Sequence, residues 1–113
     1  MIRITSFGFR AGGAPAPAFV FDCRGLKNPH FEPALRDLDG TSPAVKTFVE
    51  KSQGFNDLYA QAKFHAITYA EPHVAFGCVG GRHRSVASAE LLAEDLRLHG
   101  HQVEVTHREL AKA

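Results

Sequence analysis

The stretch from His73 to Val86, HVAFGCVGGRHRSV, joins an apolar run to a glycine pair and then to a cluster of basic residues. Residues 73–79 predict a buried strand, and the pair Gly80-Gly81 predicts the turn that ends it. From about His83 to His99 the apolar side chains recur at helical spacing, and Gly100 is a suitable stop after the helix. A strand that passes through a glycine turn into a helix is typical of an α/β fold.

The segments before and after this unit predict further strands and helices. Residues 1–9 alternate and residues 18–23 are mostly apolar, so each predicts a strand, and QVEVT at 102–106 predicts another. A helix is expected to open at Ser42-Pro43, because serine is a good N-cap and proline a good first residue. A second helix is expected over 55–66, where apolar residues keep helical spacing.

This order predicts one domain over residues 1–113, a small α/β sandwich built on a roughly four-stranded sheet. The connector AGGAPAP, residues 11–17, is shorter than the dozen or so residues that a parallel crossover needs. We therefore expect an antiparallel or non-adjacent pairing of the first two strands, and hence a mixed sheet. A long ordered loop is expected over 24–43, with a short helical turn near 34–38, and a last helical turn over 107–112.

Composition narrows the class of protein. The chain has 113 residues, with 44% hydrophobic and 22% charged residues, which is ordinary for a globular domain. Lys and Arg total 13 against 12 Asp and Glu, so net charge does not indicate a strongly basic nucleic-acid binder. Two cysteines make no disulfide framework, and no apolar run reaches the ~18 residues of a membrane span. A cytoplasmic protein is expected.

The glycine turn and the basic cluster after it predict an anion site. Glycines allow the backbone to turn and to come close to a ligand, and the first N–H groups of the following helix attract negative charge. Arg82, His83 and Arg84 add cationic side chains at the same place, Arg84 can grip a phosphate with two parallel hydrogen bonds, and Ser85 offers a hydroxyl. The alternative is a turn whose glycines serve only geometry.

A second group of polar residues follows the second predicted strand. Asp22 comes at its end, and Asn28-Pro29-His30 predicts a rigid turn that can fix an imidazole. If the two strands are parallel, both loops leave from the same edge of the sheet, where ligands bind in α/β proteins. The candidate ligand-binding residues are Asp22, Asn28, His30, Cys78, Val79, Gly80, Gly81, Arg82, His83, Arg84 and Ser85.

A Cys-dependent phosphatase is an alternative interpretation of the same segment. Cys78, Arg84 and Ser85 resemble the Cys…Arg-Ser phosphate loop of protein tyrosine phosphatases, in which a thiolate attacks phosphorus. Gly77 stands where those enzymes commonly have histidine, and only Asp22 is placed to be the general acid. No catalytic residue is assigned unless this alternative holds. The chain contains no Gly-x-x-x-x-Gly-Lys-Ser/Thr loop for nucleoside triphosphates.

The remaining histidines suggest neither a metal site nor a cofactor. Histidines outside the two segments lack the spacing of metal ligands; they are His65, His73, His99, His101 and His107. Together with Arg82 and Arg84, the basic residues Arg97, His99, His101, His107 and Arg108 could form a rim that touches RNA. An RNA-binding adaptor domain is therefore a further alternative.

Several strings resemble the C-terminal domain of the RNase adapter protein RapZ family, over nearly the whole chain. The strings are SFGFRAG at 6–12, VFDCRGLKNPH at 20–30, GCVGGRHRSV at 77–86 and THREL at 106–110. The resemblance implies a non-enzymatic regulatory module that binds glucosamine-6-phosphate, with small regulatory RNAs and a sensor kinase as partners. It implies a pocket made of the residues given above, except Val79 and Arg82.

Full-length members of that family also carry a P-loop nucleotide-binding domain. The resemblance therefore suggests either a standalone domain without it or a fragment of a longer protein. The expected ligand is an amino sugar phosphate or a similar phosphorylated metabolite, the expected partner is RNA or a regulatory protein, and an oligomer is possible.

Overall fold

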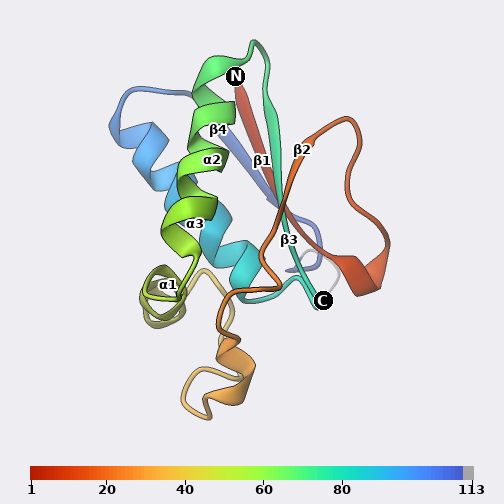
Figure 1. The fold of residues 1–113 in the computed structure, drawn as a ribbon, viewed down its shortest axis with the longest axis vertical. Coiled ribbons are helices and arrows are strands. Elements are labelled where there is room, and N and C mark those ends of the chain that lie inside the picture. Colours follow the sequence, from red (N-terminus) through yellow and green to blue (C-terminus); the bar gives the residue numbers. More distant parts are fainter. Residues whose placement is uncertain (111–113) are drawn as a thin grey trace.

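The computed structural model describes residues 1–110, and in this range a parallel four-stranded sheet is packed on one side by three α-helices (Figure 1). The strands are β1 (Ile2–Gly8), β2 (Phe19–Asp22), β3 (His73–Cys78) and β4 (Val103–His107), in the spatial order β2-β3-β1-β4. All neighbouring pairs are parallel. The α/β class and the strand segments were therefore predicted correctly.

The expectation of a mixed sheet was wrong. Of the two alternatives for the first two strands, an antiparallel or a non-adjacent arrangement, the structure has the second. β3 lies between β1 and β2, and β2 runs parallel to both. The ten residues 9–18 can span about 33 Å when extended, which exceeds the ~23 Å length of a seven-residue strand. The connector therefore returns the chain to the start of the sheet as a loop, with only the short 3-10 helix η1 (Phe9–Ala11) in it.

The helices α1 (Pro43–Glu50), α2 (Phe55–Thr68) and α3 (Arg84–Leu98) share one hydrophobic core with the sheet. α3 lies along β1, β3 and β4, α2 lies along β2 and β3, and α1 packs on α3 (Figure 1). The sheet contributes alternate residues to this core. Its strand residues include Ile2, Ile4, Val74 and Phe76. The helices contribute Val45, Val49, Ala62, Ala66, Ala89, Leu92 and Leu96.

The long loop after β2 contains one short element that the sequence did not suggest, the 3-10 helix η2 (Pro29–Phe31). Residues 34–38 form hydrogen-bonded turns and no regular helix. β4 continues through His107, and the turn expected over 107–112 extends beyond the described residues. Within 1–110, no helix is both long and apolar enough to cross a membrane.

The other face of the sheet is closed at one end by two aromatic side chains that lie on a glycine. Phe7 is fully buried, and its ring meets that of Phe9 edge to face, with 4.8 Å between the centroids. Both rings lie over Gly77, where a Cβ would come within 2.6 Å of Phe9 Cε2 and 2.8 Å of Phe7 Cε2. The absence of a side chain at Gly77 lets this aromatic pair reach the sheet.

We expect Gly77→Ala to lower the free energy of unfolding by about 1–3 kcal/mol, because the new methyl group overpacks the site. Urea denaturation followed by circular dichroism measures the change. Gly25→Ala is the matched control, since its Cβ would meet no atom within 4 Å. Equal stability of the two variants would contradict the packing role of Gly77.

Candidate functional site

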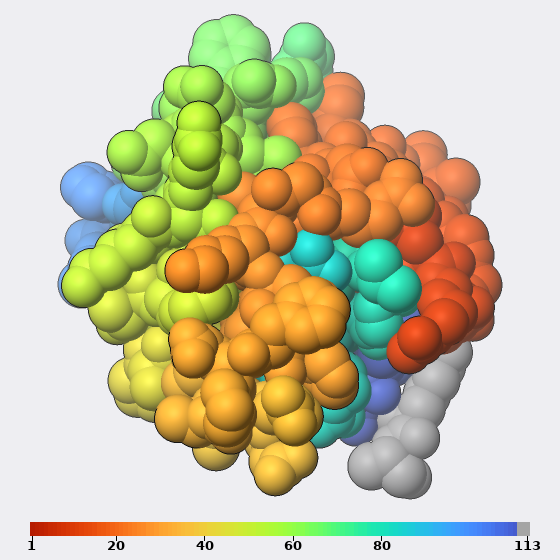
Figure 2. Space-filling model, turned by 60° about the horizontal axis from the view of Figure 1, so that its bottom comes forward, coloured from red at the N-terminus to blue at the C-terminus, as the bar shows by residue number. Residues whose placement is uncertain are grey.

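The carboxyl ends of three strands meet at one edge of the sheet, where the glycine turn lies. Gly8 is paired with Cys78, and Asp22 is paired with Gly77, so β1, β2 and β3 all end at this level. Five residues, 79–83, connect the end of β3 to the first residue of α3. In Figure 2 this segment, in teal, is exposed between the 24–42 loop, in orange, and the 9–18 connector, in red-orange.

The turn is pressed against the end of β1. Gly81 has a positive φ of +76°, and a Cβ there would lie 2.6 Å from the Gly8 nitrogen and 2.6 Å from Glu109 Cγ. A Cβ on Gly8 would in turn lie 2.7 Å from the carbonyl carbon of Gly80. The close approach of these two backbone segments explains why glycine stands at both positions.

Glu109 holds the other side of this contact. Its Oε2 atom accepts hydrogen bonds from the Gly8 main-chain N–H and from Arg108 Nε, each at 2.8 Å. Arg108 also donates to the carbonyl oxygens of Gly12 and Gly13 in the β1–β2 connector. The residues that follow β4 thereby pack against the glycine turn and the end of β1.

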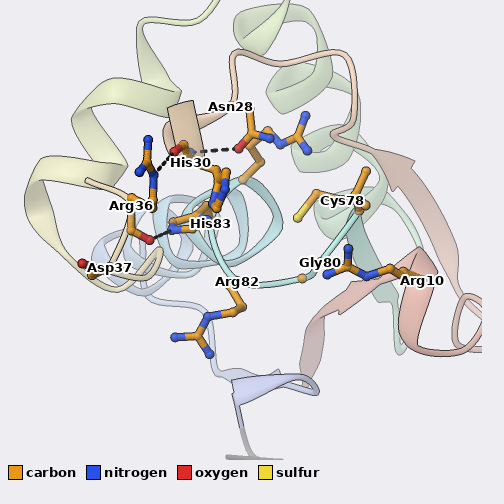
Figure 3. A pocket seen from close by; sticks show the side chains of 12 residues that line it. Arg10, Asn28, His30, Arg36, Asp37, Cys78, Gly80, Arg82 and His83 are labelled. Carbon is orange, nitrogen blue, oxygen red and sulfur yellow. Dashed lines mark hydrogen bonds between the residues drawn. The ribbon is translucent and has the colours of Figure 1, made fainter. Parts of the chain in front are cut away.

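A cavity of about 430 Å³ opens at this edge (Figure 3). That volume lies within the ~300–1,000 Å³ typical of small-molecule sites. The described residues that line it are Arg10, Asn28, His30, Arg36, Asp37, Cys78, Val79, Gly80, Gly81, Arg82, His83 and Arg84. The structure thus brings nine of the eleven candidate residues together and leaves Asp22 and Ser85 outside the lining.

One wall of the cavity is the η2 segment, which is tied to the glycine turn by a chain of hydrogen bonds. Asn28 Oδ1 accepts from the His30 main-chain N–H at 3.0 Å, and Arg36 Nε donates to the His30 carbonyl at 2.8 Å. His83 Nε2 donates to the Arg36 carbonyl at 3.2 Å, so this nitrogen carries a proton. Figure 3 shows both contacts of Arg36 as dashed lines.

Arg84 is the buried cation of the site. Its side chain is only 6% exposed, and Nη1 donates to the carbonyls of Arg24 and Leu26, at 2.8 and 3.2 Å. A buried guanidinium is stable only when its N–H groups find acceptors. Arg84 therefore fixes the start of the 24–42 loop against α3 while it also lines the cavity.

The two cysteines lie near each other in the fold but differ in their access to the cavity. Cys78 lines it, although the residue is 2% exposed, and its Sγ lies 3.2 Å from Ser85 Oγ. Cys23 is fully buried beside Ser88, and burial raises the pKa of its thiol to about 12. Cys23 is therefore a protonated core residue, and only Cys78 faces the site.

Asp22 stands at the end of β2, where its carboxylate is engaged by a neighbour. Arg24 donates to it from the main-chain N–H, from Nε and from Nη2, and the Arg24 guanidinium lies 4.0 Å from the centre of the Phe9 ring. The Arg24 hydrogen bond lowers the pKa of Asp22, even though burial acts in the opposite direction. An ionised carboxylate is poorly suited to be the general acid that a phosphatase needs.

The sequence analysis missed three residues that line the cavity: Arg10, Arg36 and Asp37. Arg10 follows the first strand directly, so its place at the carboxyl edge could have been inferred once β1 was placed in the centre of the sheet. Arg36 and Asp37 belong to an irregular loop that has no periodicity to interpret. Their positions follow only from the folded loop.

The residues considered for a basic rim are dispersed. His107 lies between Ser6 Oγ and Glu90 Oε2, at 2.7 and 2.9 Å, and is part of the packing around β4. Arg97 and the C-cap residue His99 lie at the far end of α3, about 20 Å or more from Arg84 along the helix axis. Within residues 1–110, no group of three or more His, Cys, Asp or Glu side chains is placed to hold a metal ion.

Comparison with known proteins agrees with the fold and the motifs. The model of the RapZ C-terminal domain family matches residues 1–111. A nucleotide-binding protein of Erythrobacter litoralis is 40% identical over 97% of this chain and 40% of its own length. Nucleotide-binding proteins of Shewanella amazonensis and Bifidobacterium adolescentis are 42% and 44% identical, over 100% and 98% of this chain and 44% and 39% of their own lengths.

The structure is that of an α/β domain with a cavity lined by basic residues at the carboxyl edge of its sheet, and the relatives named above are bacterial proteins. The chain belongs to the RapZ C-terminal domain family. It spans about two fifths of the length of the curated relatives named above.

We expect Arg24→Gln to raise the pKa of Asp22 toward the ~3.9 of a free aspartate, because the variant removes the charge and two donors that favour the ionised form. A ¹³C NMR pH titration of the carboxyl carbon measures it. Because the folded pKa is lowered, the contact stabilises the fold above about pH 3.9 and is lost as the pH falls through the folded pKa.

Arg36→Gln is the control for this titration, since Arg36 Nε donates to the His30 carbonyl and not to Asp22. An unchanged Asp22 pKa in Arg24→Gln would show that other donors hold the carboxylate.

Proposed function

We propose that this domain binds a phosphorylated small metabolite, with an amino sugar phosphate such as glucosamine-6-phosphate as the leading candidate. The observation that carries the proposal is the cavity in which the glycine turn, the start of α3 and basic side chains face the same space. The side chain of His83, the N-cap residue of α3, makes no capping hydrogen bond, and in this proposal the first N–H groups of the helix face the ligand. A phosphate monoester carries about −1.5 to −2 charges at neutral pH, which complements such a surface.

In this proposal one wall of the cavity binds the phosphate group and the opposite wall binds the sugar. The turn at 79–83 and the start of α3 cradle the phosphate, and Arg84 adds the guanidinium. Asn28, His30 and Asp37 on the opposite wall offer amide, imidazole and carboxylate groups. A carboxylate suits an ammonium group, and amide and imidazole groups suit hydroxyls, so this wall would read an amino sugar.

The proposed role of binding is regulatory. Occupancy would tie the 24–42 loop to the turn more firmly, and the altered surface would change the affinity for a partner, either an RNA or a protein. The relatives are named nucleotide-binding proteins, and that name describes proteins more than twice as long as this chain. Since residues 1–113 contain no P-loop motif, we assign the cavity to a phosphate ester and not to nucleoside triphosphate hydrolysis.

The first test is an amide NMR titration with glucosamine-6-phosphate, glucose-6-phosphate and inorganic phosphate. We expect saturable shifts at Gly80 to Ser85 with all three, and additional shifts at Asn28 and His30 with the two sugars. Tighter binding of the amino sugar would identify the role of Asp37. No shift of these amides with any of the three compounds would refute the proposal.

Arg84→Lys should weaken phosphate-ester binding about tenfold, equal to about 1.4 kcal/mol, because lysine keeps the charge but loses the two-pronged guanidinium. Isothermal titration calorimetry measures the affinity, and circular dichroism verifies that the variant folds. Arg97→Lys, at the far end of α3, is the matched control. Equal affinity in Arg84→Lys and the wild type would exclude Arg84 from the phosphate contact.

A hydrolase remains the second candidate because of one observation, the 3.2 Å contact between Cys78 Sγ and Ser85 Oγ at the cavity. If the domain hydrolyses phosphate esters, p-nitrophenyl phosphate should be turned over between pH 5 and 8, and Cys78→Ser should abolish turnover. We expect no turnover, because Asp22 lies outside the cavity lining and is held ionised by Arg24. Cys78-dependent release of p-nitrophenol would overturn the binding-module proposal.

A further inference from the structure

The two cysteines of the chain, Cys23 and Cys78, are free thiols at the ends of neighbouring parallel strands. The Cys23 main-chain N–H donates to the Gly77 carbonyl at 2.7 Å, which extends the pairing of Asp22 with Gly77 by one position. Cys23 therefore stands directly opposite Cys78. Neighbouring strands lie about 4.7–4.9 Å apart, which is within the ~4.4–6.8 Å that separates the Cα atoms of a disulfide.

The two thiols also lie on the same side of the sheet. Both cysteines belong to the hydrophobic core between the sheet and the helices. Cys78 Sγ lies 3.2 Å from Ser85 Oγ, and Cys23 Sγ lies 3.7 Å from Ser88 Oγ. Ser85 and Ser88 are three positions apart on α3, and residues at that spacing are neighbours on one face of a helix. Both sulfurs are therefore held over the same short stretch of α3.

The cavity gives a small molecule access to only one of these thiols. Cys78 lines the cavity, and in Figure 3 its sulfur, in yellow, points toward the wall that carries His30. Cys23 is fully buried, and burial raises the pKa of its thiol to about 12, so this thiol is protonated and shielded from solvent. Because Cys78 is itself only 2% exposed, a small neutral oxidant such as hydrogen peroxide suits this cavity better than a bulky disulfide.

We propose that Cys78 and Cys23 form a peroxide-sensitive dithiol, in which oxidation of Cys78 in the cavity is followed by a disulfide bond to Cys23. In the first step the Cys78 thiolate attacks one oxygen of hydrogen peroxide, the O–O bond breaks, and a sulfenic acid and hydroxide are formed. In the second step the Cys23 sulfur attacks the Cys78 sulfur, and the departing hydroxide takes up the Cys23 proton to become water. The two thiols together lose two electrons, and the peroxide is reduced to water.

The disulfide joins the two segments that form opposite walls of the cavity, at the points where they leave the sheet. The 24–42 loop starts directly after Cys23, and the glycine turn starts directly after Cys78. Formation of the bond also takes the Cys78 sulfur out of its contact with Ser85. This inference goes beyond the proposed function and stands independently of it, because neither step requires a phosphate ester.

The test is mass spectrometry of the full chain after exposure to hydrogen peroxide. Because the sequence has two cysteines, an internal disulfide lowers the mass of the chain by two hydrogen atoms. After digestion with trypsin in the absence of reductant, the same bond links the peptides 11–24 and 64–82. We expect both results in the wild type, and we expect dithiothreitol to reverse them.

Two matched variants assign the order of the steps. Cys23→Ser should stop at a sulfenic acid on Cys78, which dimedone traps. Cys78→Ser should react about tenfold more slowly than Cys23→Ser, because the thiol that it retains is buried. In concentrated urea the two variants should react at similar rates, since unfolding exposes both thiols. Circular dichroism verifies that the variants fold without urea.

The linked peptides of the wild type test the pairing without any substitution. A wild-type chain that is unreactive, that accumulates the dimedone adduct without the internal bond, or that forms disulfide-linked dimers instead would overturn the proposal. Equal rates for the two folded variants would overturn the role of Cys78 as the first thiol to react.

Discussion

The contact between the end of β1 and the glycine turn is the constraint on which the site depends. Gly8 and Gly81 allow two backbone segments to touch where any side chain would separate them. Glu109 fixes this contact through the Gly8 N–H, and Arg10 extends it through the Val79 carbonyl. The glycine turn that lines the cavity is thus positioned by backbone packing. That packing also determines where the basic side chains on and beside the turn lie.

Much of the architecture followed from local sequence patterns. Alternation and apolar runs identified each strand, and helical spacing identified α1, α2 and α3. The parallel direction of β2 did not follow, because it depends on the path of the 9–18 loop, and a loop of Gly, Ala and Pro carries no pattern that shows its direction. The error came from treating a minimum crossover length as a rule, when an extended loop of ten residues can return along a short strand.

The candidate site was predictable to the extent that its residues are close in sequence. The segment 78–84 lines the cavity as a unit because a strand, a turn and a helix start must be contiguous. Arg36 and Asp37 enter it through a fold of the 24–42 loop that is stabilised by the buried Arg84. Asp22 is only a few residues from Asn28 in the sequence, but its carboxylate is paired with Arg24 and it does not line the cavity. Side-chain partnerships of this kind are decided by three-dimensional packing, which no motif records.

The central position of β1 has a consequence for how the chain folds. Within the described residues, β1 pairs with β3 and β4, whose residues lie about seventy to one hundred positions later in the chain. β2 likewise pairs with β3, which is synthesised later. The hydrogen bonds of this sheet can therefore form only once β3 has been synthesised, about seventy residues after β1. Such a high contact order implies slow folding relative to helical domains of this size and a period in which nascent apolar strands are exposed.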